Sequence, residues 1–107
     1  MKTQKQRDTL IVYPQGELDH HSAQAMREEM DAAMEDRQIR TLILDLRDLT
    51  FMDSSGIGVL LGRLRILQSR GGTLSVKNMQ PSVEKLFRLS GLQRVIGIEE
   101  SNRGGRL

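Results

Sequence analysis

Short apolar runs alternate along the chain with amphipathic stretches, and the two patterns predict strands and helices in turn. The predicted strands are residues 9–13, 41–46, 73–77 and 95–98. The predicted helices are residues 20–37, 55–69 and 81–90. This alternation is typical of right-handed β-α-β crossovers. The predicted fold class is therefore α/β, with a mixed, mostly parallel sheet of about four to five strands and alternating crossover helices.

Individual residues refine this prediction. Residues 41–46 are almost continuously apolar, which favours a central strand covered on both faces. Pro14 interrupts the first strand, so we expect that strand near an edge or an end, where a missing N–H donor is tolerated. Gly16 predicts a turn, and Asp19 or Ser22 is the candidate N-cap of the following helix.

Two polar loops follow predicted strands, at residues 16–21 and 51–56. Functional loops gather at the carboxyl ends of parallel strands. If the two strands are neighbours, both loops lie on one rim of the molecule.

Length and composition limit the possible classes of protein. The 107 residues predict a single domain, with a core at about 9–99 and a frayed tail at 100–107. Cysteine is absent, so disulfides, thiolate chemistry and Cys-ligated zinc are excluded, and a reducing compartment fits. Since no run is long enough to span a membrane, we expect a cytoplasmic protein without a membrane partner.

The charge distribution argues against direct binding to nucleic acid. The formal net charge is +2, but residues 8–102 hold 11 basic and 14 acidic residues, a net charge of −3. Only Tyr13, Phe51 and Phe87 are aromatic, so the chain offers little surface for stacking bases and no basic stripe for phosphates.

The segment FMDSSGIGVLLGR, residues 51–63, does not fit the enzymatic motifs that it resembles at first sight. Its glycines, Gly56, Gly58 and Gly62, lack the spacing of a dinucleotide fingerprint. Arg63 follows the last glycine, where a phosphate-binding loop needs Lys. A nucleophile elbow needs a glycine two residues before the serine, and neither serine has one. The sequence therefore predicts no catalytic residue.

His20 and His21 are the only histidines and could in principle supply a base or a metal ligand. Adjacent side chains point in different directions, and no third histidine exists, so we interpret them as an exposed pair at a helix start. Asp53 is interpreted as an N-cap or Asx-turn residue rather than a catalytic acid. We accordingly predict neither a metal nor a cofactor.

The predicted helix at 55–69 is apolar on more than one side. The side expected to face the sheet consists of Ile57, Leu60, Leu61, Leu64 and Leu67. The opposite side consists of Ser55, Val59, Gly62 and Ile66, flanked by Arg63. A solvent-facing side normally carries charges, so this pattern favours a docking surface for a partner. The alternative is a helix buried on both sides by the same chain.

A serine at the start of that helix is well placed for a charge switch. Phosphorylation adds about −1.5 to −2 charges at pH 7. The helix N-terminus tolerates such a charge, with an effect of about 0.3–1 kcal/mol, so the fold need not change. A partner fitted to a neutral serine would lose several kcal/mol of affinity. Spacing alone does not choose between Ser54 and Ser55.

Four segments together resemble a known family: GELDHH (16–21), TLILDL (41–46), FMDSSGIGVLLGR (51–63) and VEKLFRLSGL (83–92). They are similar to the anti-sigma factor antagonists of the STAS domain family, in collinear order over about residues 9–99. The DSSG loop is typical of the wider family, whereas GELDHH with the longer segment favours its sporulation branch. Two features depart from the family pattern: Pro14, and a tail with too few apolar residues for the usual C-terminal helix.

The resemblance implies a regulatory binding protein with no activity or cofactor of its own. The unphosphorylated antagonist binds an anti-sigma factor that is also a serine kinase, which uses ATP, and the sigma factor is released to start transcription. The forespore sigma factor of sporulation is the one expected here. The resemblance assigns phosphorylation to Ser54, which blocks binding, and it implies a metal-dependent serine phosphatase that reverses the modification.

The partner surface expected from the resemblance and the pattern combines the two loops with one side of the helix. It consists of Gly16, Glu17, Asp19, His20, His21, Asp53, Ser54, Ser55, Gly56, Ile57, Val59, Gly62, Arg63 and Ile66. Three alternatives stay open: an antagonist of a general-stress anti-sigma factor, a small nucleotide-binding or hydrolytic enzyme, and a STAS module of a larger assembly.

Overall fold

The computed structural model describes residues 1–99, which form seven strands, three α-helices and one short 3-10 helix. The strands are β1 (Lys2–Gln6), β2 (Thr9–Tyr13), β3 (Gly16–Leu18), β4 (Thr41–Asp45), β5 (Leu49–Met52), β6 (Thr73–Lys77) and β7 (Gly97–Glu99). The helices are α1 (Ala23–Ala33), α2 (Ser54–Ser69), α3 (Pro81–Leu89) and the 3-10 helix η1 (Leu92–Arg94). The expected frayed tail at 100–107, and the question of a C-terminal helix there, lie outside the described residues.

The main sheet has five strands in the order β1-β2-β4-β6-β7. β1 is antiparallel to β2, and the other neighbours are parallel, which confirms the predicted mixed, mostly parallel α/β sheet. A second, two-stranded parallel sheet pairs β3 with β5. The sequence did not predict β1, β3 or β5. β1 has no apolar residue and is exposed along its whole length, and the other two are only three and four residues long.

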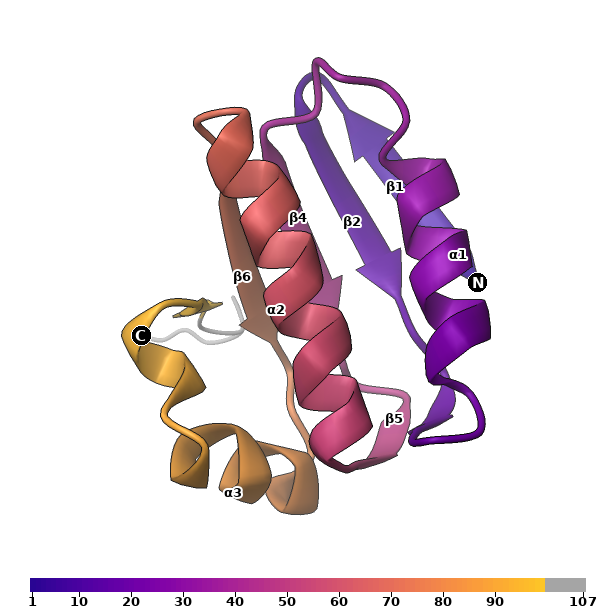
Figure 1. Cartoon of the computed structure of the whole chain (residues 1–107), viewed down its shortest axis with the longest axis vertical. Helices are drawn as coiled ribbons and strands as arrows, with labels where there is room; N and C mark the ends of the chain where they lie inside the picture. The colour runs from indigo at the N-terminus through magenta and orange to yellow at the C-terminus, as the bar shows by residue number, and fades with distance from the viewer. Residues whose placement is uncertain (100–107) are drawn as a thin grey trace, which may run out of the picture.

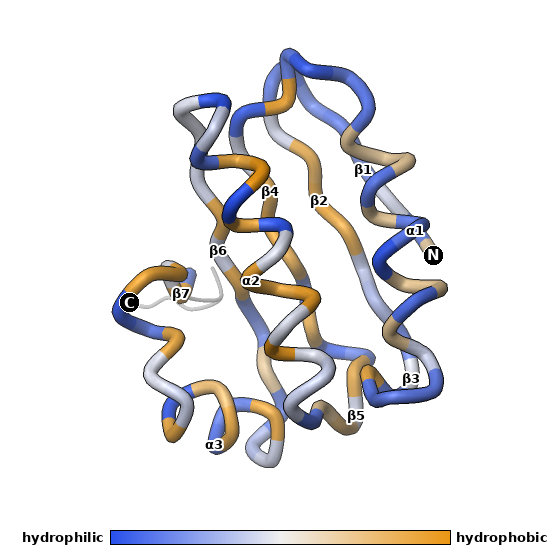
Figure 2. Tube along the Cα trace, viewed as in Figure 1, coloured by the Kyte–Doolittle hydropathy of each residue, from blue (hydrophilic) through white to orange (hydrophobic). Residues whose placement is uncertain are grey.

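Helices α1 and α2 lie side by side on one face of the main sheet (Figure 1). The largely hydrophobic β2 and β4 pass behind them (Figure 2). Strand residues alternate accordingly: Leu42 and Leu44 are fully buried, whereas Ile43 between them is partly exposed on the other face. The predicted strand is present, but the expectation that it is covered on both faces is wrong, because within residues 1–99 no helix lies on the far side.

Pro14 lies at the end of its strand, not at the edge of the sheet. β2 is internal, since it pairs with β1 on one side and β4 on the other. Pro14 is buried and comes directly after the last residue of β2, where the ladder needs no further donor. Gly16 follows with a φ of 82°, a left-handed conformation that favours glycine, and this confirms the predicted turn.

Helix α3 lies beyond the carboxyl end of β6 and packs against β5 (Figure 1). The start of α2 and the β3–β5 pair are at this same end of the molecule. The polar loops of the sequence are therefore gathered at the carboxyl ends of β2 and β4. Within residues 1–99, no helix is long and apolar enough to cross a membrane.

Candidate functional site

The two polar loops lie on one rim because the short strands within them pair with each other. In the register of the β3–β5 pair, Glu17 lies opposite Phe51 and Leu18 opposite Met52. The backbone N–H of Asp53 then donates to the carbonyl oxygen of Leu18 over 3.2 Å. The expectation of a single rim is confirmed, and it rests on backbone hydrogen bonds rather than on flexible side chains.

Asp53 is the N-cap of α2, as the sequence predicts. Its backbone is extended, and its Oδ1 accepts hydrogen bonds from the N–H of Ser55 at 2.8 Å and of Gly56 at 3.4 Å. Ser54 is the first residue of the helix and is exposed. Its hydroxyl forms no hydrogen bond within residues 1–99. The serine hydroxyl is thus accessible, while the carboxylate beside it stabilises the helix start.

Residues 19–22 form a hydrogen-bonded turn, so α1 begins at Ala23 rather than near residue 20. Asp19 Oδ1 accepts from the N–H of His21 at 2.9 Å and of Ser22 at 3.0 Å. The N–H of Ser22 is the main cause that lowers the pKa of Asp19. Ser22 occupies the N-cap position without a side-chain cap bond, and its hydroxyl instead donates to the carbonyl of Glu17 at 2.6 Å. This loop therefore has a defined conformation before any partner binds.

His20 and His21 are both exposed, and their rings meet edge to face with centroids 5.6 Å apart. In the part of the chain that the structure describes, no group of three or more His, Cys, Asp or Glu side chains could hold a metal ion.

A buried carboxylate supports the rim from behind. Asp45, at the end of β4, accepts hydrogen bonds from Arg47 Nη2 at 2.8 Å and from Asn78 Nδ2 at 3.2 Å. Burial alone raises the pKa of Asp45, but these hydrogen bonds outweigh it and hold the pKa below its ordinary value. Gln80 Nε2 donates to the carbonyl of Arg47 at 2.8 Å, which links the approach to α3 with the loop between β4 and β5.

The glycines of α2 divide into one that the fold requires and two that it does not. A Cβ on Gly56 would lie 2.4 Å from Met52 Cγ and 3.0 Å from the carbonyl oxygen of Leu18. A Cβ on Gly58 or Gly62 would meet nothing within 4 Å. Glycine in a helix interior costs about 1 kcal/mol relative to alanine. Within residues 1–99, no neighbouring atom requires glycine at these two positions.

The prediction of which residues of α2 are exposed is partly wrong. Val59 and Arg63 are buried, whereas Leu61, expected to face the sheet, is 37% exposed. The reason is that α2 packs against both the sheet and α1, so its buried side is rotated toward α1. Arg63 reaches α1, where its Nε lies 3.0 Å from Asp31 Oδ1.

The predicted partner residues therefore fall into three groups by exposure. Exposed are Gly16, Glu17, His20, His21 and Ser54. Partly exposed are Asp19, Asp53, Ser55, Ile57, Gly62 and Ile66. Buried are Gly56, Val59 and Arg63, which support the surface from within and are removed from the predicted contact set. The name rim surface is used below for the exposed and partly exposed groups together.

Phe51 lies beside the rim surface, opposite Glu17, and the sequence pattern did not indicate it. It belongs to β5 and is 44% exposed, although it is one of only three aromatic residues. Large aromatic side chains are rarely left in water and often anchor protein interfaces. The available signal was its position two residues before Asp53, but its exposure depends on which way β5 faces.

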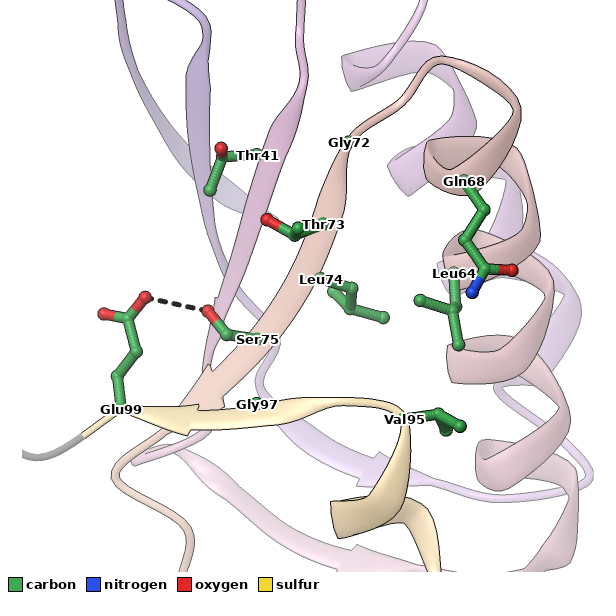
Figure 3. A pocket seen from close by; sticks show the side chains of 10 residues that line it. All are labelled: Thr41, Leu64, Gln68, Gly72, Thr73, Leu74, Ser75, Val95, Gly97 and Glu99. Atoms are coloured by element: carbon green, nitrogen blue, oxygen red, sulfur yellow. Dashed lines mark hydrogen bonds between the residues drawn. The ribbon is translucent and has the colours of Figure 1, made fainter.

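A separate hollow of about 370 Å³ lies beside β6 and β7 (Figure 3). In it the Ser75 hydroxyl donates to Glu99 Oε2 at 2.8 Å. Among residues 1–99, its lining contains no residue of the rim surface, and Glu99 is its one titratable side chain. This hollow therefore does not compete with the rim as the functional site.

The sequence matches the STAS domain family over residues 1–103. The anti-sigma F factor antagonist of Paenibacillus polymyxa is 42% identical over 95 residues, which are 89% of this chain and 81% of that protein. The anti-sigma-B factor antagonist of Bacillus subtilis (strain 168) is 34% identical over 90 residues, which are 84% of this chain and 81% of that protein.

Two solved structures of SpoIIAA, one unphosphorylated and one phosphorylated, are among those that resemble this structure. The unphosphorylated anti-sigma factor antagonist SpoIIAA has a TM-score of 0.80 and 33% identity, with 95% of this chain and 88% of that chain covered. The phosphorylated form of Bacillus SpoIIAA has a TM-score of 0.72 and 32% identity, with 95% and 91% covered.

The division of the glycines predicts opposite effects of two neighbouring substitutions. Gly56→Ala is expected to lower the free energy of unfolding by about 1–3 kcal/mol, because its methyl group overlaps Met52 and Leu18. Gly58→Ala is expected to raise it by up to about 1 kcal/mol, since the methyl group is unobstructed. Urea unfolding of both variants measures the difference, and a similar loss in the two would contradict the assignment.

Proposed function

The chain belongs to the STAS domain family, and on that premise we propose that it is an anti-sigma factor antagonist controlled by phosphorylation of Ser54. The relatives are regulatory proteins, and the prediction that the chain is not an enzyme is confirmed. The observation that carries the proposal is the exposed Ser54 hydroxyl, held at the first position of α2 beside the paired strands β3 and β5.

In the unphosphorylated state, the rim surface and Phe51 bind an anti-sigma factor, and the bound sigma factor is released. The rim surface suits this role because Phe51 beside it is an exposed apolar anchor, and the α2 backbone is unobstructed at Gly62 and at the neighbouring Gly58. Both features favour close contact with another protein. No cofactor of the chain's own takes part in this step.

Phosphorylation blocks binding through charge. The anti-sigma factor, acting as a serine kinase, transfers the γ-phosphoryl group of ATP to Ser54 Oγ; the hydroxyl loses its proton and ADP leaves. The product carries about −1.5 to −2 charges next to Asp53. Nearby Glu17 and Asp19 are also acidic, and none of the three forms an ion pair within residues 1–99. A serine phosphatase restores the hydroxyl by hydrolysis.

The sigma factor of the forespore in sporulation is the proposed target. The support is the higher identity to the sigma-F antagonist, 42% against 34% for the sigma-B antagonist. A general-stress system is the second candidate, because that relative also spans most of the chain. Action in the cytoplasm, without direct contact to nucleic acid or membrane, is part of the same proposal.

The phosphorylation site can be tested directly with the anti-sigma F factor of Paenibacillus polymyxa and ATP. Mass spectrometry is expected to map the modification to Ser54, and Ser55→Ala is expected to be modified normally. Ser54→Ala should bind the factor like the unmodified chain and resist phosphorylation. Ser54→Asp should bind at least about thirtyfold more weakly, because the carboxylate must be desolvated.

Ser90→Asp is the matched control, since it adds the same charge at an exposed serine on the end of α3. Its affinity should equal that of the unmodified chain. Modification at Ser55, or undiminished binding by Ser54→Asp, would refute the switch.

Phe51→Ala tests the apolar anchor. It is expected to weaken binding to the same factor by about tenfold or more, because a central aromatic side chain is removed from the interface. Leu89→Ala is the control: Leu89 is 76% exposed on α3, outside the rim surface. Calorimetric titration measures both affinities, and urea unfolding checks that each variant is folded. Equal affinities would remove Phe51 from the interface.

A further inference from the structure

A cleft of about 380 Å³ opens between the first turns of α1 and α2, next to Ser54. Its lining consists of His20, Ala23, Gln24, Arg27, Ser55 and Gly58. Two of these, His20 and Ser55, belong to the rim surface, whereas three come from α1: Ala23 is buried, Arg27 is partly exposed and Gln24 is exposed. The cleft is therefore continuous with the proposed binding surface but adds side chains that the sequence did not suggest.

Arg27 is the only permanently charged residue in this lining, and it has no carboxylate partner within residues 1–99. Its Nη1 donates to Gln24 Oε1 at 2.6 Å. Gln24 in turn donates from Nε2 to Glu28 Oε2 at 2.7 Å, so Glu28 is bound to the amide and not to the guanidinium. Most of the N–H donors of Arg27 are left for another acceptor.

A second cation lies close by and is already matched. Arg63 is buried with its Nε 3.0 Å from Asp31 Oδ1, an ion-pair distance, although neither its Nε nor its Nη1 forms a hydrogen bond within residues 1–99. Burial is the main cause that lowers the pKa of Arg63; Asp31 opposes this effect, and the charge of Arg27 adds to it. Asp31 is thus paired with Arg63, and Arg27 lies within ion-pair distance of no carboxylate in residues 1–99.

The other lining groups suit an anion as well. The Ser55 hydroxyl and the His20 ring can both donate hydrogen bonds. Gly58 leaves the α2 side open, since a Cβ there would meet nothing within 4 Å. A guanidinium with unused donors binds a carboxylate through two parallel hydrogen bonds.

We propose that this cleft receives a carboxylate side chain of the anti-sigma factor, held by Arg27. This proposal rests on the proposed function and specifies the chemistry of the partner. The cleft is lined by Ser55 and not by Ser54, the residue that receives the phosphoryl group. The occupant is a side chain of the partner, and its nucleotide is the competing outcome of the test.

The test compares three substitutions at Arg27 by titration with the anti-sigma F factor of Paenibacillus polymyxa. Arg27→Gln is expected to weaken binding about ten- to hundredfold, the effect of losing charge-assisted hydrogen bonds. Arg27→Glu should weaken it further, and Arg27→Lys should restore part of the loss. Arg37→Gln removes the same charge from an exposed residue beyond the far end of α1 and should change affinity less than twofold.

Each titration is carried out twice, once with the factor bound to ADP and once with the factor bound to a non-hydrolysable ATP analogue. An equal loss of affinity in both nucleotide states supports a carboxylate as the group bound by Arg27. A loss of affinity seen only with the ATP analogue would overturn the proposal in favour of a nucleotide phosphate. A factor variant with Lys in place of one surface Asp or Glu should restore binding of Arg27→Glu.

The possible failures are distinguishable. If the unmodified chain binds and Arg27→Gln binds equally well, the cleft receives no carboxylate and the proposed function stands. If the unmodified chain does not bind the factor, the proposed function fails and the cleft proposal fails with it.

Discussion

The close approach of the first turn of α2 to β3 and β5 is the constraint on which the candidate site depends. Gly56 lies where a single methyl group would overlap Met52 and the backbone of Leu18. Those residues belong to the paired strands that bring the two polar loops together. Only glycine permits this contact, and the contact fixes where Asp53 and Ser54 stand relative to residues 16–22.

This arrangement separates the stability of the site from its chemistry. Asp53 satisfies the exposed N–H groups of the helix start, and backbone pairing holds the loop in place. The Ser54 hydroxyl contributes none of these interactions. A phosphate at that position can therefore change what the surface attracts while leaving the fold intact, and the helix N-terminus offsets part of the added charge.

Much of the site was predictable from local chemistry. The Asp53 cap, the Gly16 turn and the common rim follow from residue type and from the rule that loops gather at the carboxyl ends of parallel strands. The position of Val59 and Arg63 was not predictable in this way, because a periodicity argument assumes one buried face and α2 has two neighbours. Only the resemblance to the antagonist family selected Ser54 over Ser55 as the phosphorylation site. The exposure of Phe51 and the cleft at Arg27 depend on how β5 and α1 are placed, which no local pattern encodes.

The central claim is that phosphorylation of Ser54 acts on binding and not on folding. Its most direct test compares the free energy of unfolding of the Ser54-phosphorylated chain with that of the unmodified chain, by urea denaturation under identical conditions. The account predicts a difference within about 1 kcal/mol, the size of a charge effect at a helix N-terminus. A loss of several kcal/mol on phosphorylation would contradict it, because the modification would then act by unfolding the rim.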